Sequence, residues 1–323
     1  SKGKKRMYKM GETLRKYYAN FLGSTCNPRN LYVRSSASDR CIESASALLA
    51  GLCPPSDRWV WCESSNSCKD IAPLWQPIAI QTVDKLLDSL LYPESECPAV
   101  EKDRLQVIRS KEVQEKLNNN KAFIDKIANF TGSKLSNETT LRALMYIADT
   151  LKCEVENGRD ENIKKLESEF GKNNTVISQL YEFALMALNY DFKTQKILRL
   201  RGGPMLSELV KNINNVVNLS ETRKFFIYST HDTVIVSLMK ALKVYNDRPP
   251  KYGEGLVFEL YHDKSITEYQ LKIFYIYHDK DYETIFHQLQ LPKCISHLFC
   301  TFNEFNSSIS QFIPSNWNKE CQN

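Results

Sequence analysis

Long apolar runs are missing from this chain of 323 residues. No run approaches the roughly 18 residues that a bilayer-spanning helix needs, and no apolar core of a secretory signal peptide is present. Zinc-ribbon spacings, paired Cys-x-x-Cys motifs, internal repeats and low-complexity linkers are also missing. These absences argue against a membrane protein, a structural zinc domain and a repeat array.

The net charge of +5 gives little support for nucleic-acid binding. Apart from the basic start Ser1–Arg6, the lysines and arginines are spread along the chain, and no nucleic-acid module accompanies them. We interpret these lysines as the solvated face of a helix. The hydrophobic content of 42% is that of a globular protein, so we expect a packed core. Because the basic residues are spread out and long apolar runs are missing, we expect no nucleic-acid or membrane partner.

Ten cysteines are too many for a typical cytosolic enzyme, and they indicate disulfides. Asn-x-Ser/Thr sequons, which agree with a secretory route, occur at Asn129, Asn137, Asn173, Asn218 and Asn306. We therefore expect a secreted, extracellular glycoprotein.

Helical and extended patterns alternate in residues 1–83 and again in 201–323, which predicts one α/β core built from both parts. The expected helices are Gly3–Leu22, Asp39–Leu52 and Val234–Leu242. The expected extended segments are Leu31–Ser36, Trp59–Cys62, Leu74–Ile80, Lys224–Tyr228 and a hairpin of Leu256–His262 with Tyr269–Tyr277. Residues 84–200 are rich in polar helical patterns, as in 176–190, and are expected to form an inserted helical domain.

Two strand ends carry polar groups suited to chemistry. Arg34 follows one predicted strand, and His231 with Asp232 follows another. In an open α/β sheet ligands bind at the carboxyl ends of strands, beside helix N-termini that favour anions, so both groups could face one pocket. Asp232 or Thr230 could instead cap the following helix.

Two further His-Asp pairs, His262–Asp263 and His278–Asp279, lie at the ends of the hairpin strands. We expect them to have ordinary turn or surface roles. Only the pair at His231 lies between an apolar strand and a helix.

An ordered set of segments resembles the histidine acid phosphatase family over nearly the whole chain. The segments are Gly3–Leu22, Tyr32–Ser36 with Asp39–Arg40, Leu74–Ile78, Tyr228–Thr233, Val244–Asn246, Glu259–Tyr261 and Ile313–Trp317 with Cys321. The resemblance implies an α/β fold of the phosphoglycerate-mutase-like kind, with a mostly parallel, doubly wound sheet and an inserted helical domain.

The resemblance also implies roles for three residues. Arg34 would grip a substrate phosphate bidentately, His231 would be a second phosphate ligand, and Asp232 would protonate the leaving-group oxygen. It implies neither a metal nor a cofactor.

The family's nucleophile is a histidine in an Arg-His-Gly-x-Arg-x-Pro motif, which occurs nowhere in these residues. Without it no phosphohistidine forms, so we interpret the chain as a binding protein rather than an enzyme. Two alternatives remain: an active secreted phosphatase whose first segment is missing from this chain, and a secreted scaffold or allergen without a small ligand.

The departure from the family pattern resembles that of the acid-phosphatase-like salivary proteins of fleas. That resemblance implies sequestration of small amphipathic host mediators, biogenic amines such as serotonin or leukotrienes, in the former phosphatase pocket. Asp232 would attract an ammonium, whereas Arg34 and His231 would favour a carboxylate. Glu254, beside Tyr252, is a candidate helper for an amine.

The resemblance implies two disulfides, Cys97–Cys321 and Cys294–Cys300. Cys153 also occupies a family position, but the partner position near Gly255 holds no cysteine. Cys62 and Cys68 suit a local bridge. The pairing of Cys26, Cys41, Cys53 and Cys153 stays open.

Overall fold

A computed structural model describes residues 2–23, 26–55, 76–136, 138–171, 175–262, 268–279 and 283–322. The extended segment expected at Trp59–Cys62 and the bridge expected between Cys62 and Cys68 lie outside the described residues. So do Leu74 and Trp75 of the expected segment Leu74–Ile80, whose remainder is irregular. None of the described helices is long and apolar enough to cross a membrane.

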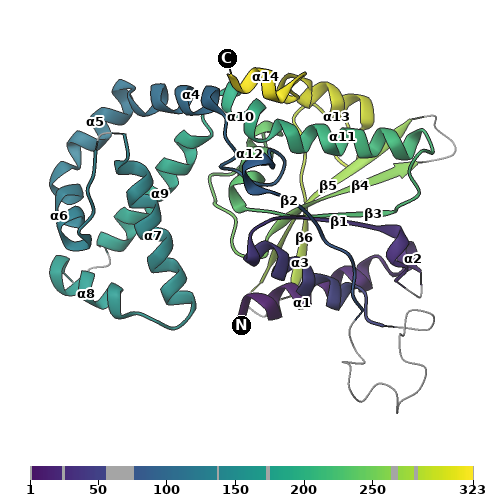
Figure 1. The fold of residues 1–323 in the computed structure, drawn as a ribbon, viewed down its shortest axis with the longest axis horizontal. Coiled ribbons are helices and arrows are strands. Elements are labelled where there is room, and N and C mark those ends of the chain that lie inside the picture. Colours follow the sequence, from purple (N-terminus) through teal and green to yellow (C-terminus); the bar gives the residue numbers. More distant parts are fainter. Residues whose placement is uncertain are drawn as a thin grey trace, which may run out of the picture. The chain divides into compact units, whose positions relative to one another are not determined.

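The chain divides into two compact units (Figure 1). The α/β unit comprises Ser1–Glu96, Arg201–Tyr245 and Pro250–Ser315, and the helical unit comprises Cys97–Leu200, Asn246–Pro249 and Asn316–Asn323. Residues 84–96, which the sequence analysis placed in the insertion, belong to the α/β unit in this division.

The α/β unit contains a parallel sheet and an antiparallel sheet. The parallel sheet has the order β2-β1-β3 and consists of β1 (Leu31–Ser36), β2 (Gln81–Val83) and β3 (Phe225–Ser229). The antiparallel sheet consists of β4 (Gly255–His262), β5 (Tyr269–His278), β6 (Thr284–Gln288) and β7 (Cys300–Thr301). The predicted α/β fold and the predicted hairpin of β4 and β5 are both confirmed.

Helices cover both faces of the parallel sheet. Leu31 and Val33 of β1 join a hydrophobic cluster with α1 (Lys2–Tyr17) and α3 (Asp39–Leu52). Tyr228 of β3 accepts a hydrogen bond from Asn212 of α11 (Gly203–Val217). Figure 1 shows α1 and α3 on one side of β1 and β3 and α11 on the other. The α/β unit also contains α12 (Asp232–Ala241) and α13 (Phe302–Ile309).

The single helix expected over Gly3–Leu22 is interrupted. It consists of α1 and a short α2 (Ala19–Leu22), with Tyr18 between them at φ −100° and ψ 22°. The Tyr18 hydroxyl donates a hydrogen bond of 2.6 Å to Glu259 of β4. A local pattern does not encode this tertiary contact, which explains why the sequence predicted a continuous helix.

The helical unit has its own core. Its helices are α4 (Pro98–Ile108), α5 (Lys111–Asn119), α6 (Lys121–Thr131), α7 (Thr140–Glu156), α8 (Glu161–Phe170), α9 (Thr175–Asp191), α10 (Gln195–Arg201, of which Arg201 belongs to the α/β unit) and α14 (Trp317–Gln322). Val113, Ile127, Leu144 and Leu180 are fully buried at its centre. Apolar residues at helical spacing account for this packing.

Both disulfides implied by the resemblance are confirmed: Cys97–Cys321 and Cys294–Cys300. A third bond joins Cys26 to Cys53, which the sequence left unassigned. Cys41 is a buried free thiol, and Cys153 lies half-buried in α7. Disulfides of this number fit an extracellular or lumenal compartment.

Helices α1 and α3 meet backbone to backbone through two glycines. A Cβ atom on Gly11 would lie 2.0 Å from the Leu48 carbonyl oxygen, and one on Gly51 would lie 2.2 Å from the Tyr8 carbonyl oxygen. Neither backbone atom can move without separating the helices. The close approach of the two helices therefore requires glycine, which has no side chain, at both positions.

Gly11→Ala and Gly51→Ala are each expected to lower the free energy of unfolding by about 2 to 3 kcal/mol, because the added methyl group overpacks the helix contact. Gly3→Ala is the control, since nothing lies within 4 Å of its Cβ position in the same helix. That variant should be neutral or more stable by up to about 1 kcal/mol through helix propensity. Urea unfolding measures all three, and equal effects in the three variants would contradict the close packing.

Candidate active site

The parallel pairing of β1 and β3 brings two distant parts of the chain to one sheet edge. Arg34 pairs with Tyr228 and Ser35 with Ser229, so both strands end together. Each strand is followed by a helix, α3 from Asp39 and α12 from Asp232. Two helix N-termini therefore lie at the edge where the polar residues gather, which favours an anion there.

His231 is buried at this edge, with 8% of its surface exposed. Its Nδ1 lies 3.0 Å from Nη2 of Arg40, and its Nε2 lies 3.0 Å from the Ser36 hydroxyl. A guanidinium only donates, so Nδ1 accepts and the ring proton resides on Nε2, which donates to Ser36. The imidazole is thus held as one neutral tautomer.

The surroundings of His231 oppose a positive charge on the ring. Burial is the largest cause and Arg40 adds to it, whereas Glu94 acts in the opposite direction and Lys85 adds a smaller lowering effect. Together they lower the pKa of His231 to about 4. The ring is therefore neutral at any pH well above that value.

Arg34 forms a buried ion pair with Asp88, at 2.6 Å between Nη2 and Oδ1. The Asp88 side chain is fully buried, and its Oδ1 also accepts from the backbone N–H groups of Leu90 and Leu91. Nε of Arg34 has no hydrogen-bond partner among the described residues. The aspartate thus orients the guanidinium.

Asp232 is exposed at the first position of α12, where its Oδ1 accepts from the N–H of Thr233. The N-cap position of α12 belongs to His231, with no side-chain capping bond. The alternative that Asp232 or Thr230 caps this helix is therefore wrong. Asp232 has the exposure that a proton donor to a substrate requires.

Glu254 and Tyr252 contact other parts of the α/β unit. Glu254 accepts a hydrogen bond of 2.5 Å from the Tyr275 hydroxyl in β5, and the backbone carbonyl of Tyr252 accepts from Arg6 in α1. The structure brings Arg34, His231 and Asp232 to one sheet edge and groups the other two residues with α1 and β5.

Sequence reasoning missed three contributors: Arg40, Ser36 and Asp88. Arg40 and Ser36 lie in the segments that carry the family resemblance, so their proximity to a strand end was a usable signal. Asp88 follows a 3-10 helix at Lys85–Leu87, a stretch without distinctive periodicity. Its contact with Arg34 needs tertiary structure to be seen.

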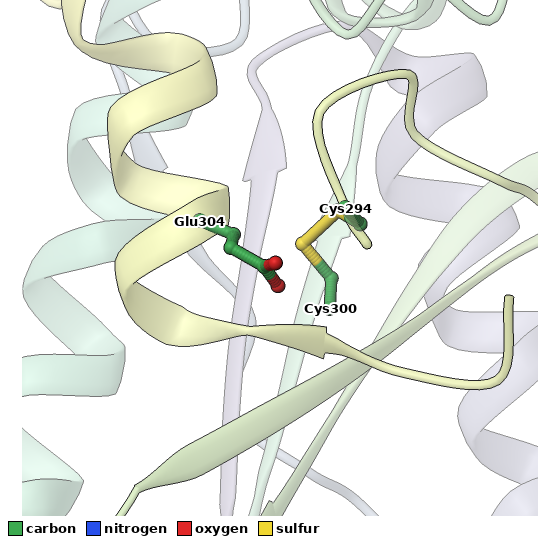
Figure 2. Close-up of side chains that lie close together, drawn as sticks. All are labelled: Cys294, Cys300 and Glu304. Carbon is green, nitrogen blue, oxygen red and sulfur yellow. A yellow bond between two sulfur atoms is a disulfide. The ribbon is translucent and has the colours of Figure 1, made fainter. Parts of the chain in front are cut away.

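One group of side chains in the described part of the chain has the spacing of metal ligands: Cys294, Cys300 and Glu304 (Figure 2). The two cysteines are joined in a disulfide, so they offer no thiolate. Glu304 accepts hydrogen bonds from the backbone of Ile295 and Thr301 and completes a capping box of α13. The group is a disulfide beside a helix cap.

Stability is expected to fall as the pH drops from about 6.5 to 4, because the unfolded state then binds a proton that folded His231 excludes. The loss should be about 2.5 kcal/mol. His231→Gln should flatten this part of the profile, whereas His287→Gln, at an exposed position of β6, should keep the wild-type slope. Denaturant unfolding at stepwise pH gives the slopes, and parallel profiles for wild type and His231→Gln would refute the assignment.

Arg34→Ala is expected to lower the free energy of unfolding by about 3 kcal/mol, since it leaves the buried Asp88 carboxylate without its cation. The double variant with Asp88→Ala should lose less than the sum of the single losses, with a coupling of about 1 to 3 kcal/mol. The exposed pair Lys111–Glu115 serves as a reference cycle with a coupling near zero. Additive losses at Arg34 and Asp88 would show that the two groups act independently.

Comparisons with known proteins agree on one family. The family described as "Histidine phosphatase superfamily (branch 2)" matches residues 1–276. Lysosomal acid phosphatase of Rattus norvegicus is 32% identical over 318 residues, covering 98% of this chain and 70% of the relative. Prostatic acid phosphatase of Homo sapiens is 29% identical over 320 residues, covering 99% and 78%.

Solved structures agree on the fold. The Klebsiella sp ASR1 phytase matches with a TM-score of 0.67 at 15% identity, covering 97% of this chain and 86% of that one. The relatives at 29 to 32% identity are acid phosphatases, so the interpretation of this chain as a non-enzyme is wrong. That interpretation gave decisive weight to a motif missing from these 323 residues.

The chain belongs to branch 2 of the histidine phosphatase superfamily.

Proposed function

We propose that the protein is an acid phosphatase that hydrolyses phosphate monoesters at the edge formed by Arg34, Arg40, His231 and Asp232. The observation that carries the proposal is the neutral His231 held beside Arg40, at an edge with two helix N-termini. Such an arrangement favours an anion with several acceptor oxygens.

Each residue has a distinct part in this proposal. Arg34, oriented by Asp88, and Arg40 donate to the phosphate oxygens and stabilise the charge that develops on them. The Nε2–H of His231 turns from Ser36 to a phosphate oxygen. Asp232 gives its proton to the ester oxygen as the bond from that oxygen to phosphorus breaks.

Phosphorus also needs a nucleophile, which the histidine of an Arg-His-Gly segment would supply if such a segment precedes Ser1. Its ring nitrogen would bond to phosphorus as the ester bond breaks, and water would then displace that nitrogen and release inorganic phosphate. The exposure and the pairing of β3 support this source of the nucleophile. All five residues of β3 are only half-buried, and in the described chain β3 pairs with β1 alone. Strands of a parallel sheet are normally covered and paired on both sides, so β3 has the exposure of a strand that accepts another neighbour.

The contacts of Tyr18 support a position for such a strand between β3 and β4. Its ring lies 5.4 Å from the ring of Phe225 in β3, and its hydroxyl lies 2.6 Å from Glu259 in β4. β4 pairs with β5 alone among the described strands. A strand added between β3 and β4 in parallel with β3 would end beside His231, where the nucleophile is needed.

The protein produced with its complete upstream coding sequence is expected to hydrolyse p-nitrophenyl phosphate at about pH 5. Asp232→Asn should lower kcat by roughly 10²- to 10⁴-fold, because the leaving oxygen loses its proton donor. Asp279→Asn, in the other His-Asp pair, is the control and should keep full activity. Activity that survives both Asp232→Asn and His231→Ala would overturn the proposed site.

Binding of inorganic phosphate tests the proposed phosphate site independently of the nucleophile. Residues 1–323 alone should bind phosphate in calorimetry, and Arg34→Ala or Arg40→Ala should weaken that binding by roughly 10-fold or more. Binding equal to that of wild type in both variants would place the phosphate elsewhere.

Binding of biogenic amines or leukotrienes, a closer relationship to flea salivary proteins, and secretion stay predictions. The charges beside His231 bear on the choice of ligand, because Arg40 and Lys85 repel an ammonium. A lipid mediator with a carboxylate therefore fits this edge better than serotonin or histamine does.

A further inference from the structure

The exposed face of α1 carries a row of lysines. Lys2, Lys5, Lys9 and Lys16 are all exposed, and their spacings of three, four and seven residues place them on one face of the helix. Met10, Gly11 and Leu14 lie on the opposite face, buried against α3. With a rise of about 1.5 Å per residue, the row extends for about 21 Å.

The net positive charge of the chain is concentrated in this helix. α1 contains seven basic residues and one acidic residue, a net charge of +6, whereas the chain as a whole carries +5. All remaining residues together therefore carry −1. The charge that a partner meets at this face is a local feature and not a general basicity of the protein.

Neighbouring carboxylates neutralise little of the charge of Lys5, Lys9 and Lys16. Lys9 lies 3.6 Å from Glu12, and Lys4, beside the row, lies 2.8 Å from Glu43 of α3, both as exposed pairs. Exposed pairs of this kind contribute little and exchange readily. Lys5 and Lys16 form no ion pair with any described residue.

Two exposed tyrosines flank the row. Tyr8 precedes Lys9 and Tyr17 follows Lys16, so each lies about 100° away around the helix, on opposite sides. Tyr8 is 42% exposed and Tyr17 is 52% exposed. A ligand lying along the lysines would have an aromatic ring at each margin.

We propose that the lysine row of α1 binds an extended sulfated polysaccharide. A linear polyanion matches a narrow, straight row of four ammonium groups, and each sulfate can accept a charge-assisted hydrogen bond. A membrane surface fits less well, because the apolar face of α1 is buried against α3. Release of counterions makes the binding strongly dependent on salt.

Heparin is the probe for this surface. The variant Lys5→Gln/Lys9→Gln/Lys16→Gln is expected to bind heparin roughly 100-fold more weakly at low salt, at about 5-fold per lysine. The control variant Lys111→Gln/Lys116→Gln/Lys121→Gln removes the same charge from exposed positions of α5 and α6 and should bind as the wild type does. Calorimetry at several salt concentrations, with column elution as a second measure, gives the comparison.

Three outcomes would overturn the proposal: no heparin binding by the wild type, equal losses in the two triple variants, or tighter binding to phosphatidylserine vesicles than to heparin. The phosphate affinity of both variants should stay at the wild-type value, because neither changes the edge at His231. The polysaccharide surface and the phosphatase site can therefore fail independently.

Discussion

The parallel pairing of β1 with β3 is the contact on which the proposed chemistry depends. It joins residues 31–35 to residues 225–229, so that Arg34 and His231 lie at one edge of the sheet. A shift of this register by one residue would turn every side chain of one strand to the other face. The cluster of Leu31 and Val33 with α1 and α3 holds the register, so the packing of the first helices also fixes the site.

Electrostatics at this edge select a single protonation state. A histidine beside an arginine would be costly if charged, and here burial and Arg40 keep the ring neutral through the mildly acidic range. A neutral ring with a fixed Nε2 proton is a donor of constant direction. At the proposed site, phosphate binding at mildly acidic pH would therefore not depend on the charge of His231, and the arginines would supply the attraction.

Much of the fold was accessible from the sequence, because apolar periodicity marks the strands β1, β3, β4 and β5 and the helix α3 at almost their observed bounds. Contacts between distant residues were not accessible: the break at Tyr18, the bond Cys26–Cys53 and the pair Arg34–Asp88 all come from tertiary packing. At the site, the strand ends predicted that Arg34 and His231 lie at one sheet edge, which is where the pairing of β1 with β3 has them. The functional error came from treating a missing motif as proof of inactivity, which a local pattern cannot establish.

The Cys97–Cys321 bond imposes an order on biosynthesis. Its partners are 224 residues apart, and the second lies in the last helix of the chain, α14. The native partner of Cys97 is therefore absent until the residues between the two cysteines, Cys153 among them, have left the ribosome. During that interval the chain can form non-native bonds, so a disulfide isomerase becomes a practical requirement for a high yield.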